Sequence, residues 1–513
     1  MKKILGQMTS FSLAVQLTQL ITMASGILSR NFLGPTQMGI WATLQLILSY
    51  SSYSSLGTSQ AIARKVPYYI GKKEGQKAAE IKNLVFSYQT FLAVLTSIGL
   101  LAFAFLFKNK LSYALFWGIL GAGMLLVLQR INGVQVSVLR AYKEFGIASR
   151  LMIWSAVMNL VFIMALAPFF HLYGFIVAMG LSFVFNIVYS ARCFDFDFKF
   201  KITRQIREVL SFGFPLMVFG VADSFFRSID KVIVVKMLGF QEMGYYSVAI
   251  MFSTFLSQIP NSLGIIMIPH VEEKYGQKES AADLSFYTKK SLEGLSSAMI
   301  IITGMAYLAV PSMVYLLMPK YAQGIQAAQY VVLGGYFTAI SMPYSTIIVT
   351  LKKQIFLLPL IGLNLLMVAF LNVGMIKLGF GIGGVAIGMI LSLFFYFLSF
   401  HILTNYFFMK AGAGQISLTS SMLRFAYLAV LLTGLEHFFQ SSLGAWGVVL
   451  RFVFFVIFIL PYIFILNRDY HIVGVLTDFI FRLGTKGHSK KTPKVDAVAD
   501  LSPKINDEPS ATI

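Results

Sequence analysis

Long apolar runs separated by short polar segments recur along most of this chain, and they predict its secondary structure. The runs are about 18 residues or longer and lack the strict apolar–polar alternation of a half-buried strand, so they predict helices. The first six expected helices lie near residues 8–29, 38–60, 84–107, 112–136, 148–170 and 172–191. Eight more follow near 208–236, 243–268, 292–318, 325–350, 355–376, 381–408, 421–440 and 446–467.

The composition indicates what these helices cross. Of the 513 residues, 57% are hydrophobic and only 12% are charged, and the mean hydropathy is +0.75. Soluble domains carry about 25% charged residues. A helix of about 20 apolar residues spans the hydrocarbon layer of a bilayer, where no water satisfies an unpaired backbone group. The sequence therefore predicts an all-α polytopic membrane protein with about 14 transmembrane helices.

The basic residues test this topology independently, because cytoplasmic loops of membrane proteins are enriched in lysine and arginine. With the N-terminus in the cytoplasm, most of the 41 lysine and arginine residues fall inside and only eight fall outside. The first run follows a basic start but has no clear cleavage site, so we expect it to remain as a span. Both termini are then cytoplasmic. The net charge of +20 reflects this face of the protein, and we expect no nucleic-acid partner.

The chain also repeats itself at a constant offset of 205 residues. The pairs Leu33-Gly34, Met38-Gly39 and Asn159-Leu160 recur as Leu238-Gly239, Met243-Gly244 and Asn364-Leu365. We expect two six-span copies, residues 1–207 and 208–410, then two further spans in 411–468 and a cytoplasmic segment, 469–513. Because six is even, the copies share one orientation and form two lobes around a central cavity, a plan that transporters use.

The last segment differs from the rest in composition. Residues 470–484 are moderately amphipathic and predict a helix on the cytoplasmic membrane surface. Residues 485–513 are polar, contain proline and lysine, and predict a disordered tail.

The densest charges within an expected span are Asp223, Arg227, Asp230 and Lys231. Charges in the hydrocarbon region are expensive and usually mark a function or an internal pair. Spacings of four and three residues place Asp223, Arg227 and Asp230 on one helical face. They form either a self-neutralising ladder or a cavity lining that meets a charged substrate or a coupling ion.

Three more polar residues are candidates for a cavity lining. Arg130 and Asn132 lie in an unusually polar stretch of the fourth span, which suits a water-filled space better than lipid. Arg30 lies at the end of the first span, where a long basic side chain also reaches the interface at little cost.

Signatures of enzymes are nearly absent from the sequence. There is no phosphate-binding glycine loop that ends in Lys-Ser/Thr and no paired-histidine zinc motif, so we expect no cofactor and no metal. The pair Asp195 and Asp197 resembles the Asp-x-Asp of metal-dependent glycosyltransferases, but it lies in a short loop without a nucleotide-binding domain. The single cysteine, Cys193, excludes an internal disulfide.

The openings of the two repeats resemble those of bacterial polysaccharide flippases. The first contains SRNFLGPTQMGIWATLQLILSY, and the second contains FGFPLMVFG followed by Ile229-Asp230-Lys231, Leu238-Gly239 and Gly244-Tyr245-Tyr246. This family belongs to the multidrug/oligosaccharidyl-lipid/polysaccharide superfamily, and the resemblance covers about residues 1–410. Fourteen spans rather than twelve resemble the lipid II flippases, in which the two extra helices help to form a groove for the lipid tail.

The resemblance implies alternating access for an undecaprenyl-diphosphate-linked oligosaccharide, moved from the cytoplasmic to the outer leaflet of the bacterial plasma membrane for O-antigen or capsule assembly. It implies substrate contacts at Arg30, Arg130, Asn132, Arg227 and Lys231, with Asp223 and Asp230 as candidates for a coupling ion. The implied partners are this glycan, the bilayer and polysaccharide polymerase or assembly proteins.

Two alternatives remain open within the superfamily, a cation-coupled multidrug extruder and a lipid II flippase. An extruder would have an acidic cavity lining, whereas the seventh span carries both signs. From another class of protein, the alternative is a membrane-embedded glycan-processing enzyme. Such an enzyme would carry a cluster of carboxylates or histidines on an external loop.

Overall fold

The computed structural model describes residues 2–460, except for 202, 204, 279, 280, 352, 411, 413, 440–446 and 448. The chain forms two compact units, Met1–Ile457 and Phe458–Ile513, and every helix named here lies in the first. The expected surface helix at 470–484 and the expected tail at 485–513 lie outside the described residues.

The described residues fold almost entirely into helices. The first five are α1 (Lys2–Ser51), α2 (Thr58–Gly71), α3 (Gly75–Leu106), α4 (Tyr113–Ala141) and α5 (Phe145–Cys193). They are followed by α6 (Ile206–Phe226), α7 (Ile229–Met237), α8 (Phe240–Lys278) and α9 (Ala281–Leu317). The last four are α10 (Ile325–Thr350), α11 (Leu357–Lys377), α12 (Gly381–Lys410) and α13 (Thr419–Phe438). Short 3-10 helices join some of them: η1 (Ser52–Ser55), η2 (Lys108–Lys110), η3 (Pro319–Gly324) and η4 (Gln354–Phe356).

Seven helices of the described chain are long and apolar enough to cross a membrane. The prediction of an all-α polytopic membrane protein is thereby confirmed. Two of the longest helices contain a break: α1 at Gly34, with φ of 71° and ψ of 170°, and α5 at His171, with φ of 48°. Each break falls between two expected spans. The total of fourteen spans stays a prediction.

The expected seventh span, 208–236, is not one continuous helix. It is divided into α6, which ends at Phe226, and α7, which begins at Ile229. At the break, the Ser228 hydroxyl donates to the Ser224 carbonyl oxygen, and the Ser228 amide bonds to Phe225 instead of Ser224. Such side-chain bonds compete with the helical pattern. The single helical face predicted for Asp223, Arg227 and Asp230 is therefore wrong.

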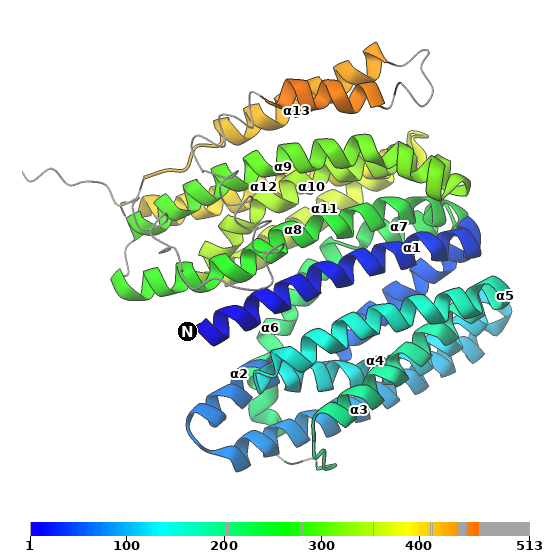
Figure 1. Ribbon diagram of the computed structural model, residues 1–513, viewed down its shortest axis with the longest axis vertical. Helices are drawn as coiled ribbons and strands as arrows, with labels where there is room; N and C mark the ends of the chain where they lie inside the picture. Colours follow the sequence, from blue (N-terminus) through cyan, green and yellow to red (C-terminus); the bar gives the residue numbers. More distant parts are fainter. Residues whose placement is uncertain are drawn as a thin grey trace, which may run out of the picture. The chain divides into compact units, whose positions relative to one another are not determined.

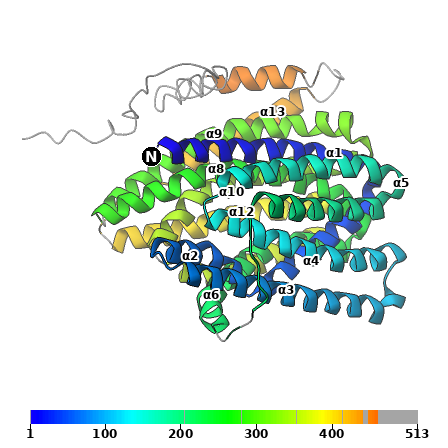
Figure 2. The same cartoon turned by 60° about the horizontal axis from the view of Figure 1, so that its bottom comes forward.

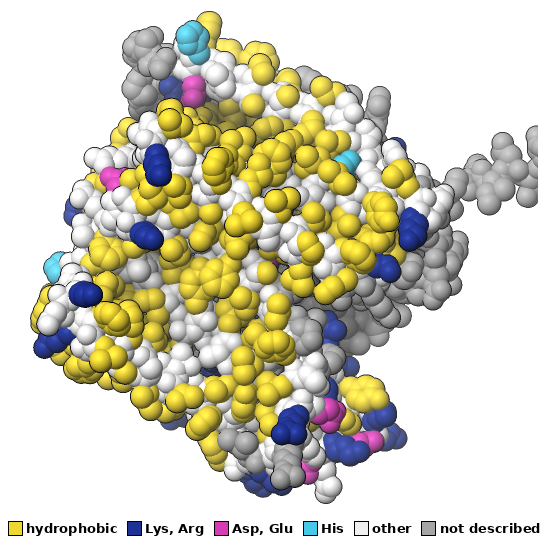
Figure 3. All heavy atoms as spheres, turned by 180° about the vertical axis from the view of Figure 1, so that it is seen from behind, with side chains coloured by type: hydrophobic (Ala, Val, Ile, Leu, Met, Phe, Trp, Pro, Cys, Tyr) yellow, Lys and Arg dark blue, Asp and Glu magenta, His cyan; other side chains and the backbone are white. Residues whose placement is uncertain are grey.

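Apolar side chains remain exposed along the outer helices. On α11, Leu363, Leu366 and Phe370 are 62%, 71% and 78% exposed, and their spacing of three and four residues forms one stripe. Figure 3 shows hydrophobic side chains over most of the viewed face, with lysine and arginine mostly near its margins. Exposed apolar area on this scale would aggregate in water, so these stripes are surfaces for lipid.

Two sets of helices pack among themselves. In the first set, α4 packs against α3 and α5, α2 packs against α3 and α4, and α6 lies beside α2 (Figure 2). In the second, α10 contacts α8, α9 and α12. Helix α1 lies between α5 and α8 and so joins the two sets (Figure 1).

The contact between α1 and α8 is close enough to require glycine on both sides. A Cβ atom on Gly39 would lie 1.7 Å from the Phe240 carbonyl oxygen, and one on Gly244 would lie 1.9 Å from the Pro35 carbonyl oxygen. Gly39 and Gly244 differ by the repeat offset, and so do Pro35 and Phe240. A reciprocal contact of this kind is what a two-fold relation between the repeats would produce. The division at 207 and 208 nevertheless stays a prediction.

This contact predicts a selective sensitivity to a single methyl group. Gly39→Ala should lower the free energy of unfolding by about 1–3 kcal/mol, because the backbones of α1 and α8 must separate to make room for the methyl group. The control is Gly99→Ala in α3, where a Cβ meets nothing within 4 Å. Thermal unfolding of the purified proteins in detergent measures the difference. Equal melting temperatures for the two variants would show that the junction is not tightly packed.

Candidate functional site

Three adjoining cavities lie among these helices, with volumes of about 500, 470 and 270 Å³. The largest, here the polar cavity, is lined by α1, α5 and α8. The second, the charged cavity, is lined by α6, α7, α8, α10 and α12. The smallest, the junction cavity, shares Arg30 with the polar cavity and Lys231 with the charged cavity, while Ile250 lines all three. The three therefore adjoin one another near the α1–α8 contact.

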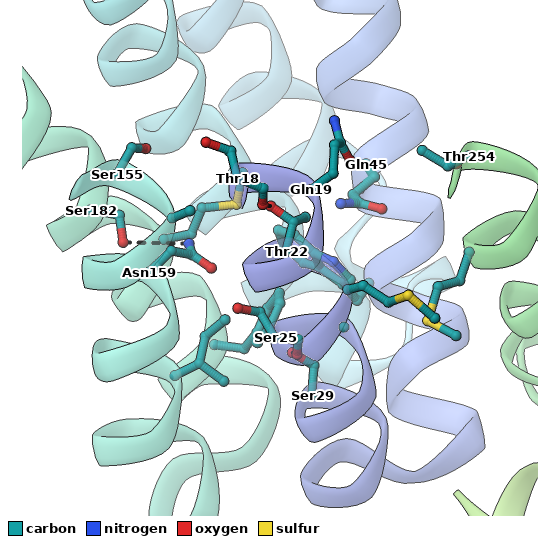
Figure 4. A pocket seen from close by; sticks show the side chains of 18 of the residues that line it. Thr18, Gln19, Thr22, Ser25, Ser29, Gln45, Ser155, Asn159, Ser182 and Thr254 are labelled. Atoms are coloured by element: carbon teal, nitrogen blue, oxygen red, sulfur yellow. Dashed lines mark hydrogen bonds between the residues drawn. The ribbon is translucent and has the colours of Figure 1, made fainter. Parts of the chain in front are cut away.

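Neutral hydroxyl and amide groups line the polar cavity together with apolar side chains, which contribute most of its exposed lining surface. Those labelled in Figure 4 are Thr18, Gln19, Thr22, Ser25, Ser29, Gln45, Ser155, Asn159, Ser182 and Thr254. Ser25 of α1 and Asn159 of α5 extend toward each other across the space (Figure 4). Among the described lining residues, Arg30 is the only charged one.

In the charged cavity, Asp223 and Arg227 neutralise one another. The Arg227 Nε lies 2.9 Å from the Asp223 Oδ2, and the Tyr396 hydroxyl donates to the Asp223 Oδ1 at 3.1 Å. The guanidinium carbon of Arg227 also lies 5.8 Å from the centre of the Tyr396 ring. These residues lie at the end of α6, and Tyr396 comes from α12. The pair is thus neutral and also lines a cavity, which is compatible with both interpretations of the cluster, and its role stays a prediction.

Asp230 belongs to the same cavity but not to this pair. It lies in the first turn of α7, is 3% exposed, and accepts a hydrogen bond of 2.7 Å from the Tyr246 hydroxyl to its Oδ2. Its Oδ1 is buried and has no partner among the described residues. The break at residues 227 and 228 turns Asp230 toward α8, so Tyr246 is its partner rather than Arg227.

The junction cavity collects positive charge from two elements. Arg30 of α1 donates from Nη1 to the Gly26 carbonyl oxygen at 2.8 Å and from Nη2 to the Ser247 carbonyl oxygen at 2.7 Å. Lys231 of α7 donates to the Arg227 carbonyl oxygen at 3.3 Å. Neither forms an ion pair within the described chain, and no carboxylate lines this cavity. The arrangement can hold an anion, because two cations face one space without a counter-charge.

The structure places the remaining two candidates apart from the cavities. The Arg130 guanidinium donates to the carbonyl oxygens of Ser51 and Ser52 at 3.0 and 2.8 Å, and to the Ser54 hydroxyl at 3.2 Å. It therefore caps the end of α1, where unpaired carbonyl groups attract a cation. Asn132 is half-buried, and its Oδ1 has no partner in the described residues. Neither side chain is among the described residues that line the three cavities.

The loop that contains Asp195 and Asp197 lies against α3. Lys82 donates to the carbonyl oxygen of Phe196, and the Lys199 ammonium lies 3.5 Å from the Asp197 carboxylate. Within the part of the chain that the structure describes, no group of three or more His, Cys, Asp or Glu residues is placed to hold a metal ion.

Several lining residues carried no signal in the sequence. Tyr246 and Tyr396 are partners of carboxylates that lie 16 and 173 residues away along the chain. Asn186 lines the polar cavity and is 2% exposed, yet a single asparagine in an apolar run is common. The hydroxyl groups of α1 recur at spacings of three and four residues, a helical stripe that could have indicated the polar face.

Comparisons with solved structures show the fold. The structure titled "Lipid II flippase MurJ, inward closed conformation" matches with a TM-score of 0.68 at 15% identity, over 90% of this chain and 99% of that one. An inward-facing multidrug resistance MATE family transporter of the MOP superfamily matches with a TM-score of 0.52 at 19% identity, over 77% and 95%. A MOP superfamily transporter from Pyrococcus furiosus matches with a TM-score of 0.50 at 19% identity, over 80% and 96%.

Comparison of the sequence gives the family. A search of curated proteins finds no match. Residues 27–323, more than half of the chain, match the family described as "Polysaccharide biosynthesis protein". The matched region contains α1 from its middle onward, the α1–α8 contact and the residues of the charged cluster. This chain is therefore a member of the polysaccharide biosynthesis protein family, with the multi-pass membrane fold of the MOP-superfamily flippases and transporters.

Proposed function

We propose that this protein is a flippase that moves an undecaprenyl-diphosphate-linked oligosaccharide from the cytoplasmic to the outer leaflet of the bacterial plasma membrane, for assembly of a surface polysaccharide. The observation that carries the proposal is the junction cavity, where Arg30 and Lys231 face one space without a carboxylate among its described lining residues. The membership of the chain in a polysaccharide biosynthesis family agrees with a saccharide cargo.

A diphosphate suits this cavity on physical grounds. Its oxygens accept charge-assisted hydrogen bonds from ammonium and guanidinium groups, and these bonds strengthen where water is scarce. Transport of a dianion outward, away from a negative cell interior, releases about 4–5 kcal/mol per 100 mV. The membrane potential can therefore drive the movement without ATP.

The charged cavity supplies the candidates for coupling. Both oxygens of Asp223 are engaged, by Arg227 and by Tyr396. Asp230 keeps one buried oxygen without a partner in the described chain, so of the two carboxylates it is the better candidate for a proton or sodium ion. Arg130 would act at the end of α1 rather than on the head group, and Asn132 lines none of the three cavities.

The alternatives account for fewer of these features. A cation-coupled multidrug extruder needs a net acidic lining. The described lining of the charged cavity contains two carboxylates and two cations, and the charged residues in the described lining of the junction cavity are both cations. A lipid II flippase shares the diphosphate, so the junction cavity does not distinguish it from a polysaccharide flippase. The partners of the proposed flippase are the lipid-linked glycan, the bilayer, and the polymerase or assembly proteins that receive the glycan.

The direct test is transport in proteoliposomes. The purified protein is reconstituted with an undecaprenyl-diphosphate-linked oligosaccharide, a potential is imposed, and the fraction of glycan accessible to an external glycosidase is followed with time. We expect accessibility to rise beyond the half that faces outward at the start. A fraction that equals that of protein-free vesicles would overturn the proposal.

Lys231 provides a sharper prediction. Lys231→Met should reduce the rate of transport at least tenfold, because it halves the charge of the junction cavity while keeping a long, unbranched side chain. The matched control is Lys236→Met on the same helix, since Lys236 is exposed and lines none of the three cavities. Normal transport by Lys231→Met at wild-type protein levels would remove this lysine from the head-group site.

Arg227 is expected to act through Asp223 rather than through the cargo. Arg227→Ala should lower the stability of the protein by about 1–3 kcal/mol, because a partly buried carboxylate loses its ionic partner. Arg227→Lys should retain most of the transport, and Asp223→Asn added to Arg227→Ala should restore part of the stability. Melting temperature and transport are measured for each variant. A stable Arg227→Lys protein without transport would instead indicate a planar, bidentate contact with the diphosphate.

A further inference from the structure

We propose that the polar cavity binds the first sugar units of the cargo and that these sugars are uncharged. This inference rests on the proposed function and adds the chemistry of the glycan, which the family description leaves open. It follows from the hydrogen-bonding groups of the lining, from one buried amide oxygen without a partner in the described chain, and from the Arg30 side chain that this cavity shares with the cationic junction cavity.

The hydroxyl groups on α1 present acceptors to the cavity. Each donates its proton to the carbonyl oxygen four residues earlier in the helix, at distances of 2.5–3.0 Å, and these are Thr18, Thr22, Ser25 and Ser29. A hydroxyl that has donated its proton still offers its lone pairs. This face of α1 therefore accepts hydrogen bonds from a ligand that carries many donors.

On the opposite side, α5 contributes an oriented amide. The Nδ2 of Asn186 donates to the Ser155 hydroxyl at 2.8 Å, and this bond fixes the direction of the amide. Its Oδ1 is buried and has no partner in the described residues, although the side chain is only 2% exposed and lines the cavity. A buried acceptor without a partner is unfavourable by about 1–3 kcal/mol, which a ligand donor would offset.

These groups select for sugar hydroxyl and acetamido groups. A cavity of about 500 Å³ is within the range of small-molecule sites. An acyl chain or an apolar drug would leave the Asn186 Oδ1 without a partner and would make no use of the lone pairs of the α1 hydroxyl groups. An acidic sugar would bring a second anion beside the diphosphate, and Arg30, which the diphosphate would already engage, is the only cation among the described residues that line this cavity.

The position of the Arg30 guanidinium agrees with separate sites for the sugar and the diphosphate. Arg30 lines both the polar and the junction cavity, so a diphosphate held there would direct its attached sugar into the polar cavity. No carboxylate lines the polar cavity in the described chain. Sugar and phosphate are thus matched by separate, adjoining surfaces.

Binding to the detergent-solubilised protein tests the inference with three probes. These are undecaprenyl diphosphate, the same carrier with one N-acetylhexosamine, and the same carrier with one hexuronic acid. We expect the neutral sugar to raise affinity about tenfold over the bare carrier and the acidic sugar to give no gain. Asn186→Leu, which preserves size but removes the amide, should abolish the gain and leave binding of the bare carrier unchanged.

The outcomes separate the two proposals. Failure of the wild type to bind the bare diphosphate carrier would overturn the proposed function. Normal binding of that carrier with no gain from the neutral sugar, or an equal gain from the hexuronic acid, would overturn the sugar assignment alone. Because Asn186→Leu could impair folding, Val184→Ala is the matched control on the same helix, at a side chain that is 43% exposed. If a folded Asn186→Leu protein still bound the neutral sugar carrier more tightly than the bare carrier, the Asn186 amide would not be the sugar contact.

Discussion

The structure depends on the contact between α1 and α8, where two backbones meet at glycine. Gly39 and Gly244 each lie against a carbonyl oxygen of the other helix, at separations that no side chain could enter. The contact lets the Arg30 guanidinium of α1 reach the Ser247 carbonyl oxygen of α8, while the Tyr321 hydroxyl donates to the carbonyl oxygen of Arg30. Since the three cavities surround this junction, its packing sets the position of the charge that they share.

The distribution of charge around the junction follows from the expense of burying ions. Asp223 and Arg227 compensate each other's charge as an ion pair, and the Asp230 carboxylate accepts a hydrogen bond from the Tyr246 hydroxyl. Within the described chain, the hydrogen bonds of the Arg30 and Lys231 side chains go only to backbone carbonyl oxygens. A carbonyl dipole compensates a full charge incompletely, so these two cations attract an anion. In the proposed flippase that anion is the diphosphate.

The sequence predicted the parts of this arrangement that are local in the chain. Hydrophobic runs indicated the helices, and the spacing of four residues indicated the pairing of Asp223 with Arg227. The break at Ser228 was missed because it depends on one hydroxyl group bonding to its own backbone. Polar character at Arg130 suggested a cavity, whereas its guanidinium caps α1 through carbonyl groups more than 75 residues away. Residues that meet through tertiary packing alone, such as Tyr396 with Asp223, left no periodic signal.

The central claim is that the cationic junction cavity recognises a diphosphate head group. The most direct measurement is the affinity of the wild-type protein, in detergent at fixed ionic strength, for undecaprenyl diphosphate, undecaprenyl monophosphate and undecaprenol. The account predicts the tightest binding for the diphosphate, weaker binding for the monophosphate, and displacement of both by inorganic pyrophosphate. Equal affinity for the uncharged alcohol, with no effect of pyrophosphate, would contradict it.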